Sequence, residues 1–242
     1  MDKELLTQWL HEREMTYYLL AKLYQARPTT ELLKTLSQNR ILVSWVEDYA
    51  QIEDHAQLAV YSAVKQMQNE LDCSLNNPAD YQERLQSDFD RLFAGPSHLE
   101  APPWESVYRS KERLVFGEQT LAVREFYRSF GLKIKKRYSE PDDHISLELE
   151  FMAWLCKQAA EPNLIQDKIG FYISGQNRFL TEHLLAWVPA LCDDIKRAAE
   201  SDFFRGLAVL TVQWLTDDAV DTENISTIFT KKSDPTLSSS CE

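Results

Sequence analysis

The sequence is poor in glycine and shows no cysteine pattern. Its 242 residues include 6 glycines and 4 cysteines. Neither a phosphate-binding G-x-x-x-x-G-K-[ST] loop nor a C-x-x-C pair occurs, which excludes the usual nucleotide hydrolases and the common cysteine-based zinc sites. We expect reduced thiols, as is typical of a protein that remains in the cytoplasm.

Long hydrophobic runs are also missing. No stretch approaches the ~20 apolar residues of a membrane span. The first residues, "MDKELLTQWLHERE", alternate apolar and charged positions and do not resemble a signal peptide. The sequence therefore predicts cytoplasmic localisation and no stable membrane insertion.

Positive charge is in deficit. The 26 Lys and Arg residues face 38 Asp and Glu residues, so the net charge is −12. This charge disfavours nucleic acid and anionic membrane surfaces as partners and suits a basic partner. The alternative is that the acidity serves only solubility.

Apolar residues recur at helical spacing along most of the chain, and no convincing run of alternating strand residues is present. The fold class predicted is all-α, a bundle of about ten helices in two parts joined by a hinge. The clearest helix is "NNPADYQERLQSDFDRLFAGP", with Pro78 in its first turn and Gly95 at its end. The predicted helices span about 3–24, 30–49, 52–71, 78–94, 120–131, 144–160, 163–185, 188–200 and 202–216.

The chain divides at a short linker that carries the basic run "KIKKRY". The predicted parts are an N-terminal helical part at 1–131, a hinge at 132–140, a C-terminal helical part at 141–216 and an extension at 217–242. The extension is polar and rich in Ser and Thr, so we expect its end to be disordered.

The segment "SEPDDHISLELEFMAW" places acids and a histidine at the start of a helix. Asp143, His144 and Glu148 lie close enough along the chain to form a metal or acid–base site, yet the Glu-x-x-His and His-Glu-x-x-His patterns are absent. Helix capping by Ser139 or Asp142 is the simpler reading, but it leaves the other polar residues unexplained. The alternative interpretation, a surface that receives a ligand, also remains open.

Five segments together resemble the TorD/DmsD family, the twin-arginine leader-binding chaperones of molybdoenzymes. "EPDDHISLELEFMAWL" looks like the central motif of that family. The other four segments that resemble its blocks are "DFDRLFAGP", "APPWESVY", "EFYRSFGL" and "RFLTEHLLAWVPAL". The resemblance covers roughly residues 80–215.

The resemblance implies a chaperone and not an enzyme. Such a protein binds the twin-arginine leader, and sometimes the body, of a molybdopterin-containing oxidoreductase. It assists cofactor insertion and delays export until maturation is complete. The expected partners are the leader and the apo-enzyme, no cofactor of its own is expected, and the family includes monomers and domain-swapped dimers.

A twin-arginine leader needs carboxylates for its arginines and an apolar groove for the residues that follow. Asp142 and Asp143, with Glu140 nearby, are the candidates for pairing with the arginines. His144 and Glu105 are further candidates for contact with the peptide. Leu92 and Phe93 fit either the groove or the core, whereas His183 and Trp187 fit the core better. The candidate groove wall consists of Leu92, Phe93, Pro103, Trp104 and Tyr108.

Two other functions remain open. A metal-dependent or nucleotide hydrolase would use Asp143, His144 and Glu148. A chaperone of the same fold would instead serve a client without a leader.

Overall fold

The regular elements that the structure describes are all helices. The computed structural model describes residues 2–51, 54–96, 98–132 and 140–232, and within them the prediction of an all-α fold with about ten helices is confirmed. The α-helices are α1 (Lys3–Gln25), α2 (Thr30–Asn39), α3 (Ile41–Ser44), α4 (His55–Ser74), α5 (Pro78–Phe89), α6 (Glu105–Arg109), α7 (Glu118–Ser129), α8 (Ile145–Ala159), α9 (Gln166–Phe179), α10 (Leu185–Ala198) and α11 (Asp202–Lys232). A 3₁₀-helix spans Glu47–Gln51, and π-helical turns span Asp90–Ala94 and Leu180–Leu184.

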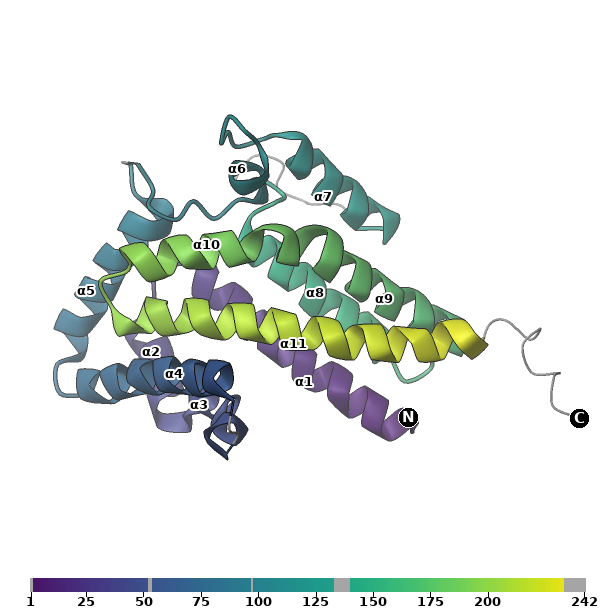
Figure 1. Ribbon diagram of the computed structural model, residues 1–242, viewed down its shortest axis with the longest axis horizontal. Coiled ribbons are helices and arrows are strands. Elements are labelled where there is room, and N and C mark those ends of the chain that lie inside the picture. The colour runs from purple at the N-terminus through teal and green to yellow at the C-terminus, as the bar shows by residue number, and fades with distance from the viewer. Residues whose placement is uncertain (1, 52–53, 97, 133–139, 233–242) are drawn as a thin grey trace, which may run out of the picture.

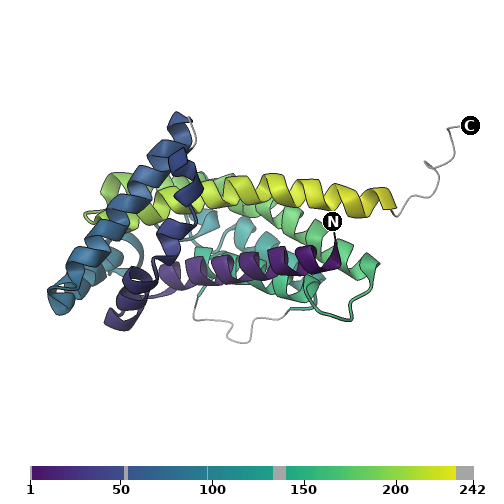
Figure 2. The ribbon, with the colours of Figure 1, turned by 90° about the horizontal axis from the view of Figure 1, so that it is seen from below.

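The long helices pack side by side around one apolar core. α1 lies along α8, and α11 contacts α4, α9 and α10. Figure 1 shows α11 crossing the molecule between α10 and α4, and in Figure 2 the axis of α1 lies roughly parallel to that of α11, with the two helices running in opposite chain directions. The largest apolar side chains of this core, Trp187, Phe179, Phe203 and Phe204, are almost completely buried. Each contributes about 1.5–3 kcal/mol relative to an exposed side chain.

Two glycines end helices for different reasons. The chain passes from α5 through the π-helical turn to Gly95, where a Cβ would lie 2.8 Å from the backbone oxygen of Asp90. Only glycine permits that approach. α7 ends before Gly131, whose φ of 78° lies in the left-handed region that glycine adopts without strain.

A buried polar network joins α1, α9 and α11. The Arg13 guanidinium donates to both carboxylate oxygens of Asp218, to Thr222 Oγ1 at 2.9 Å and to Gln176 Oε1. The Tyr17 hydroxyl donates to the same carboxylate. Burial is the largest single influence and lowers the pKa of Arg13, but the Asp218 charge, the hydrogen bond to Asp218 and the nearby Cys156 and Tyr17 together raise the pKa above its ordinary value. The buried guanidinium is therefore charged, and each of its three nitrogens donates to a partner.

The last helix is longer than predicted. The expected end at residue 216 is wrong, because α11 continues to Lys232. Asp218 and Thr222 are buried, and Ile225 and Phe229 pack against the core. These residues recur every three or four positions, so they form one helix face that includes polar members. The tail at 233–242, with its expected disorder, lies outside the described residues.

The predicted break between residues 185 and 188 is also wrong. After α9 the chain makes the π-helical turn Leu180–Leu184 and continues directly into α10, which contains Pro189. The division of the chain into two parts stays a prediction, and most of the predicted hinge, 133–139, lies outside the described residues.

Asp218→Ala is expected to lower the free energy of unfolding by about 3–5 kcal/mol, because it leaves the Arg13 guanidinium buried without its counter-charge. Urea unfolding followed by circular dichroism measures the change. Glu223→Gln, on the exposed side of the same helix, serves as the matched control and should leave the midpoint unchanged. A loss no larger than that of the control would contradict the role of the pair.

Candidate functional site

The two motifs that the sequence singled out lie against each other. Trp104 and His144 form an isolated antiparallel bridge. The N–H of Glu105 donates to the Asp143 oxygen at 3.0 Å, and the N–H of Ile145 donates to the Pro103 oxygen at 2.9 Å. Pro103 has no N–H of its own, so it can only accept. The loop that leads into α6 therefore occupies one of the free backbone donors at the start of α8.

Asp143 caps the short helix α6 from a distance. Its Oδ2 accepts from the N–H of Ser106 at 2.8 Å, while Trp104, the residue at the helix start, provides no capping side chain. A carboxylate at this position also complements the helix dipole. Asp143 is 0% exposed, and its Oδ1 has no hydrogen-bond partner among the described residues.

Asp142 holds α7 in place. Its carboxylate pairs with the Arg124 guanidinium, and its backbone oxygen accepts from the Tyr127 hydroxyl at 3.1 Å. Asp142 is only 4% exposed. Capping of α8 by Asp142 is therefore not observed, and Ser139, the other capping candidate, lies outside the described residues.

His144 is the residue that caps α8. Its Nδ1 accepts from the N–H of Ser146 at 3.1 Å and lies 2.8 Å from the Ser146 hydroxyl. Burial lowers the pKa of His144 to about 4, so the ring is neutral near pH 7. The Trp104 ring meets the imidazole edge-on, with the ring centroids 5.8 Å apart.

Two further carboxylates are completely buried beneath this region. Glu105 lies 2.9 Å from His183 Nδ1 and pairs with Arg109. Glu148 accepts from the indole nitrogen of Trp187 at 3.1 Å. Burial, and then the nearby Glu105 charge, raise the pKa of Glu148 well above its ordinary range. Glu148 is therefore disposed to keep its proton.

The expectation of an exposed polar surface is wrong for four of the candidate residues. Asp142, Asp143, His144 and Glu105 are all buried and bonded within the protein. The physical reason is that each residue has a partner within the protein. Asp143 and His144 cap the starts of α6 and α8. Asp142 and Glu105 form ion pairs with Arg124 of α7 and Arg109 of α6.

The other acidic candidate, Glu140, is exposed, and its Oε1 accepts from the Trp104 indole nitrogen at 2.9 Å. Trp104 itself is half-buried. This pair is the accessible part of the two motifs.

The residues of the predicted groove wall also divide into buried and half-buried side chains. Leu92 and Phe93 are buried in the core, where Phe93 meets Phe204 with ring centroids 5.7 Å apart. Pro103 is buried as well. Tyr108 is half-buried, and its hydroxyl donates to Asp194 Oδ2 at 3.1 Å. The core reading of Leu92 and Phe93 is the one that the structure bears out.

His183 and Trp187 are buried, as predicted. Arg124 and Arg109, which hold Asp142 and Glu105, were missed. Arg109 follows Glu105 by one helical turn, a spacing that could have indicated the ion pair. Arg124 lies 18 positions from Asp142, and no local spacing predicts that pair.

The hydrolase alternative requires Asp143, His144 and Glu148 to converge on one site, and they do not. Asp143, His144 and Glu148 each have a different partner within the protein. In the part of the chain that the structure describes, no group of three or more His, Cys, Asp or Glu side chains is arranged to hold a metal ion. None of the described helices has the length and hydropathy needed to cross a membrane.

The surface carries a groove that the sequence did not reveal. It measures about 880 Å³ and is lined by residues of α1, of α11 and of the α2–α3 region. We call it the α1–α11 groove. Its α11 wall includes Trp214, Asp217 and Asp221. The last two belong to the segment 217–242 that was predicted to be an extension.

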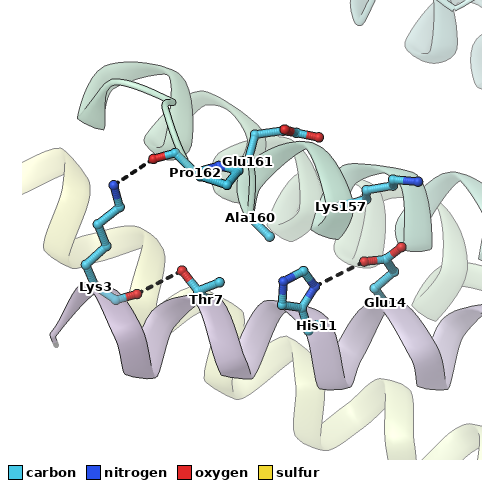
Figure 3. Close-up of a pocket in the computed structure, with 8 residues that line it drawn as sticks. All are labelled: Lys3, Thr7, His11, Glu14, Lys157, Ala160, Glu161 and Pro162. Atoms are coloured by element: carbon cyan, nitrogen blue, oxygen red, sulfur yellow. Dashed lines mark hydrogen bonds and ion pairs between the residues drawn. The ribbon is translucent and has the colours of Figure 1, made fainter.

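A smaller hollow of about 460 Å³ lies where α1 faces the end of α8 (Figure 3). There Lys3 Nζ donates to the Pro162 oxygen at 2.8 Å, and His11 Nδ1 lies 3.4 Å from a carboxylate oxygen of Glu14. His11 also lines the α1–α11 groove. The two hollows therefore follow each other along α1.

Several known proteins share sequence similarity with this chain. Residues 53–193 match the family model of the nitrate reductase delta subunit. The probable Tat proofreading chaperone DmsD of Haemophilus influenzae is 32% identical over 148 residues, which cover 61% of this chain and 66% of the relative. The Tat proofreading chaperone DmsD of Salmonella typhi is 31% identical over 137 residues, 55% of this chain and 61% of the relative.

Two further matches extend over more of the chain. The chaperone protein TorD of Aliivibrio fischeri is 26% identical over 212 residues, which cover 87% of this chain and 94% of the relative. The crystal structure of a putative redox enzyme maturation protein from Archaeoglobus fulgidus has a TM-score of 0.45 at 21% identity and covers 84% of this chain and 94% of that one. The aligned segment thus spans two thirds or less of the two DmsD relatives and most of TorD.

Acidification should destabilise the protein through His144. The folded-state pKa of about 4 lies below the ordinary value of 6.5, so between these values the unfolded chain binds a proton that the folded chain excludes. Stability should therefore fall as the pH drops through this window. His144→Asn keeps a side-chain oxygen for the N–H of Ser146 but does not titrate.

Urea unfolding across the same pH window compares the two proteins. The wild type should lose stability more steeply than His144→Asn. Parallel pH profiles would mean that His144 takes up a proton without cost in the folded protein.

Proposed function

Because the chain belongs to the nitrate reductase delta subunit family, we propose that it is a cytoplasmic chaperone for the maturation of a redox enzyme. Its client is a molybdopterin-containing oxidoreductase exported by the twin-arginine pathway. The chaperone binds the leader, assists cofactor insertion and delays export until the enzyme is mature. The printed names of the DmsD and TorD relatives support this proposal.

The observation that carries leader binding is the accessible pair of Trp104 and Glu140. An indole ring stands beside an exposed carboxylate that already accepts its N–H at 2.9 Å. A guanidinium can stack on such a ring and pair with such a carboxylate at once. This combination suits one arginine of a leader.

The remaining candidates act around this pair. Asp142, Asp143, His144 and Glu105 position the loop and the three helix ends that present it, through the caps and ion pairs described above. Pro103 precedes Trp104 in the chain, and the half-buried Tyr108 lies four residues after it in α6. Leu92 and Phe93 support the loop from the core, since the N–H of Ala101 donates to the Leu92 oxygen at 3.0 Å.

A leader peptide should bind the purified protein, and Trp104→Ala should weaken binding about tenfold through the loss of the stacking surface. Isothermal titration calorimetry with a synthetic molybdoenzyme leader measures this. Leu121→Ala, an exposed leucine on α7, is the control and should bind as the wild type does. Replacing the two arginines of the leader by lysines should also weaken binding. If leaders from several molybdoenzymes fail to bind, the proposal is wrong.

Two substitutions of Asp143 separate positioning from direct contact. Asp143→Asn retains an oxygen for the N–H of Ser106 and should bind the leader nearly as well as the wild type. Asp143→Ala removes the cap and should weaken binding, with faster hydrogen exchange at residues 104–110. Equal loss in both variants would instead indicate that the carboxylate itself pairs with the leader.

A further inference from the structure

The α1–α11 groove lies apart from the Trp104–Glu140 pair and is built from other helices. Its volume of about 880 Å³ lies within the ~300–1,000 Å³ of typical ligand pockets. Its walls come from α1, from the α2–α3 region and from α11, whereas Trp104 precedes α6. In Figure 1, α2 and α3, which contribute to the groove, lie below α11, whereas α6 and α7 lie at the top, above α10.

One side of the groove is apolar and aromatic. Trp9, Trp45 and Trp214 line it and are half-buried, with the rings of Trp45 and Trp214 centred 6.1 Å apart. Met15, also in the lining, is 68% exposed. Tryptophan and methionine offer large, adaptable contact surfaces for an apolar partner. An open cluster of this kind is costly to leave in water without a function.

The other side of the groove is acidic, and two of its acids, Asp217 and Glu12, accept hydrogen bonds from neutral groups. Asp217 accepts from the Tyr49 hydroxyl and from the Gln213 amide, and Glu12 accepts from the Gln8 amide. Burial, and then the charges of Asp218 and Asp217, raise the pKa of Asp221. A cation placed here would relieve this repulsion.

The cationic side chains in the lining are already engaged. Arg13 is held by Asp218, and Lys22 lies 3.2 Å from Glu150. His11 lies beside Glu14. The field of the groove is therefore set by Glu12, Asp217 and Asp221, and it favours a positively charged occupant.

We propose that the α1–α11 groove is a second binding site, which holds a peptide segment of the client in which apolar side chains adjoin an arginine or lysine. The apolar residues lie on the three tryptophans and Met15, and the cation meets Asp217 and Asp221. The identity of the client rests on the proposed function, but the chemistry of the occupant rests on the groove alone. One chaperone would thus hold its client at two places.

A fluorescein-labelled synthetic peptide with two arginines next to a run of leucine and phenylalanine tests the proposal by fluorescence anisotropy. The double variant Asp217→Asn/Asp221→Asn should reduce its affinity about tenfold, because two charge-assisted contacts are lost. Glu223→Gln, a neutralisation on the exposed side of α11, is the matched control and should change little. Raising the salt concentration should weaken the wild-type complex.

The apolar side is tested separately. Met15→Glu places a charge among the tryptophans and should weaken binding, whereas Leu121→Glu makes the same change at an exposed leucine on α7 and should not. A peptide with glutamines in place of the arginines should bind more weakly to the wild type. Circular dichroism verifies that each variant is folded.

The outcomes also separate this site from the leader site. Probe binding that survives Trp104→Ala and fails in the groove variants supports the proposal. Absence of probe binding, or binding that is lost in Trp104→Ala and unaffected in the groove variants, overturns it. Leader titration with Trp104→Ala is a separate measurement, so a failure of the proposed function is recognised independently.

Discussion

The buried ion pair between Arg13 and Asp218 is the constraint on which the arrangement of the helices depends. It joins the first helix to the last one, and Gln176 adds α9 to the same network. Charge buried at this depth tolerates little displacement, because any separation leaves an unpaired guanidinium in the core. The pair thereby sets how α1 and α11 meet, and with it the walls of the α1–α11 groove.

Buried charge has a second role at the two sequence motifs. Asp142, Asp143 and Glu105 face inward and hold helix ends and a loop, so that the surface they leave is Trp104 with Glu140. A proline-rich segment cannot complete its own hydrogen bonds, since each proline lacks an N–H. The N–H of Ile145 at the start of α8 donates to the Pro103 oxygen, and the Asp143 carboxylate accepts from the N–H of Ser106, which follows the prolines. The polar residues that look most like reactive groups in the sequence thus hold the helix ends and the loop in position.

Most of the fold was accessible from the sequence, and much of the site was not. Helical spacing predicted α1, α5, α7 and α8 within a few residues, because their apolar stripes are regular. The end of α11 was missed because its buried face contains Asp218 and Thr222, which composition marks as surface residues. The burial of Asp143 was missed for a related reason. Its partner Ser106 lies 37 positions away, and no local sequence pattern predicts that contact. Long-range pairing of polar groups is where single-sequence reasoning fails.

The union of the first and last helices has a consequence for biosynthesis. Arg13 and Asp218 are separated by 205 positions, so the ribosome makes one partner about 10–40 s before the other. During that time the Arg13 guanidinium of α1 has no counter-charge and no Thr222 hydroxyl to accept from it. The nascent chain is therefore itself in need of protection until its final helix emerges. A protein proposed to shield an unfinished client is, during its own synthesis, in the same situation.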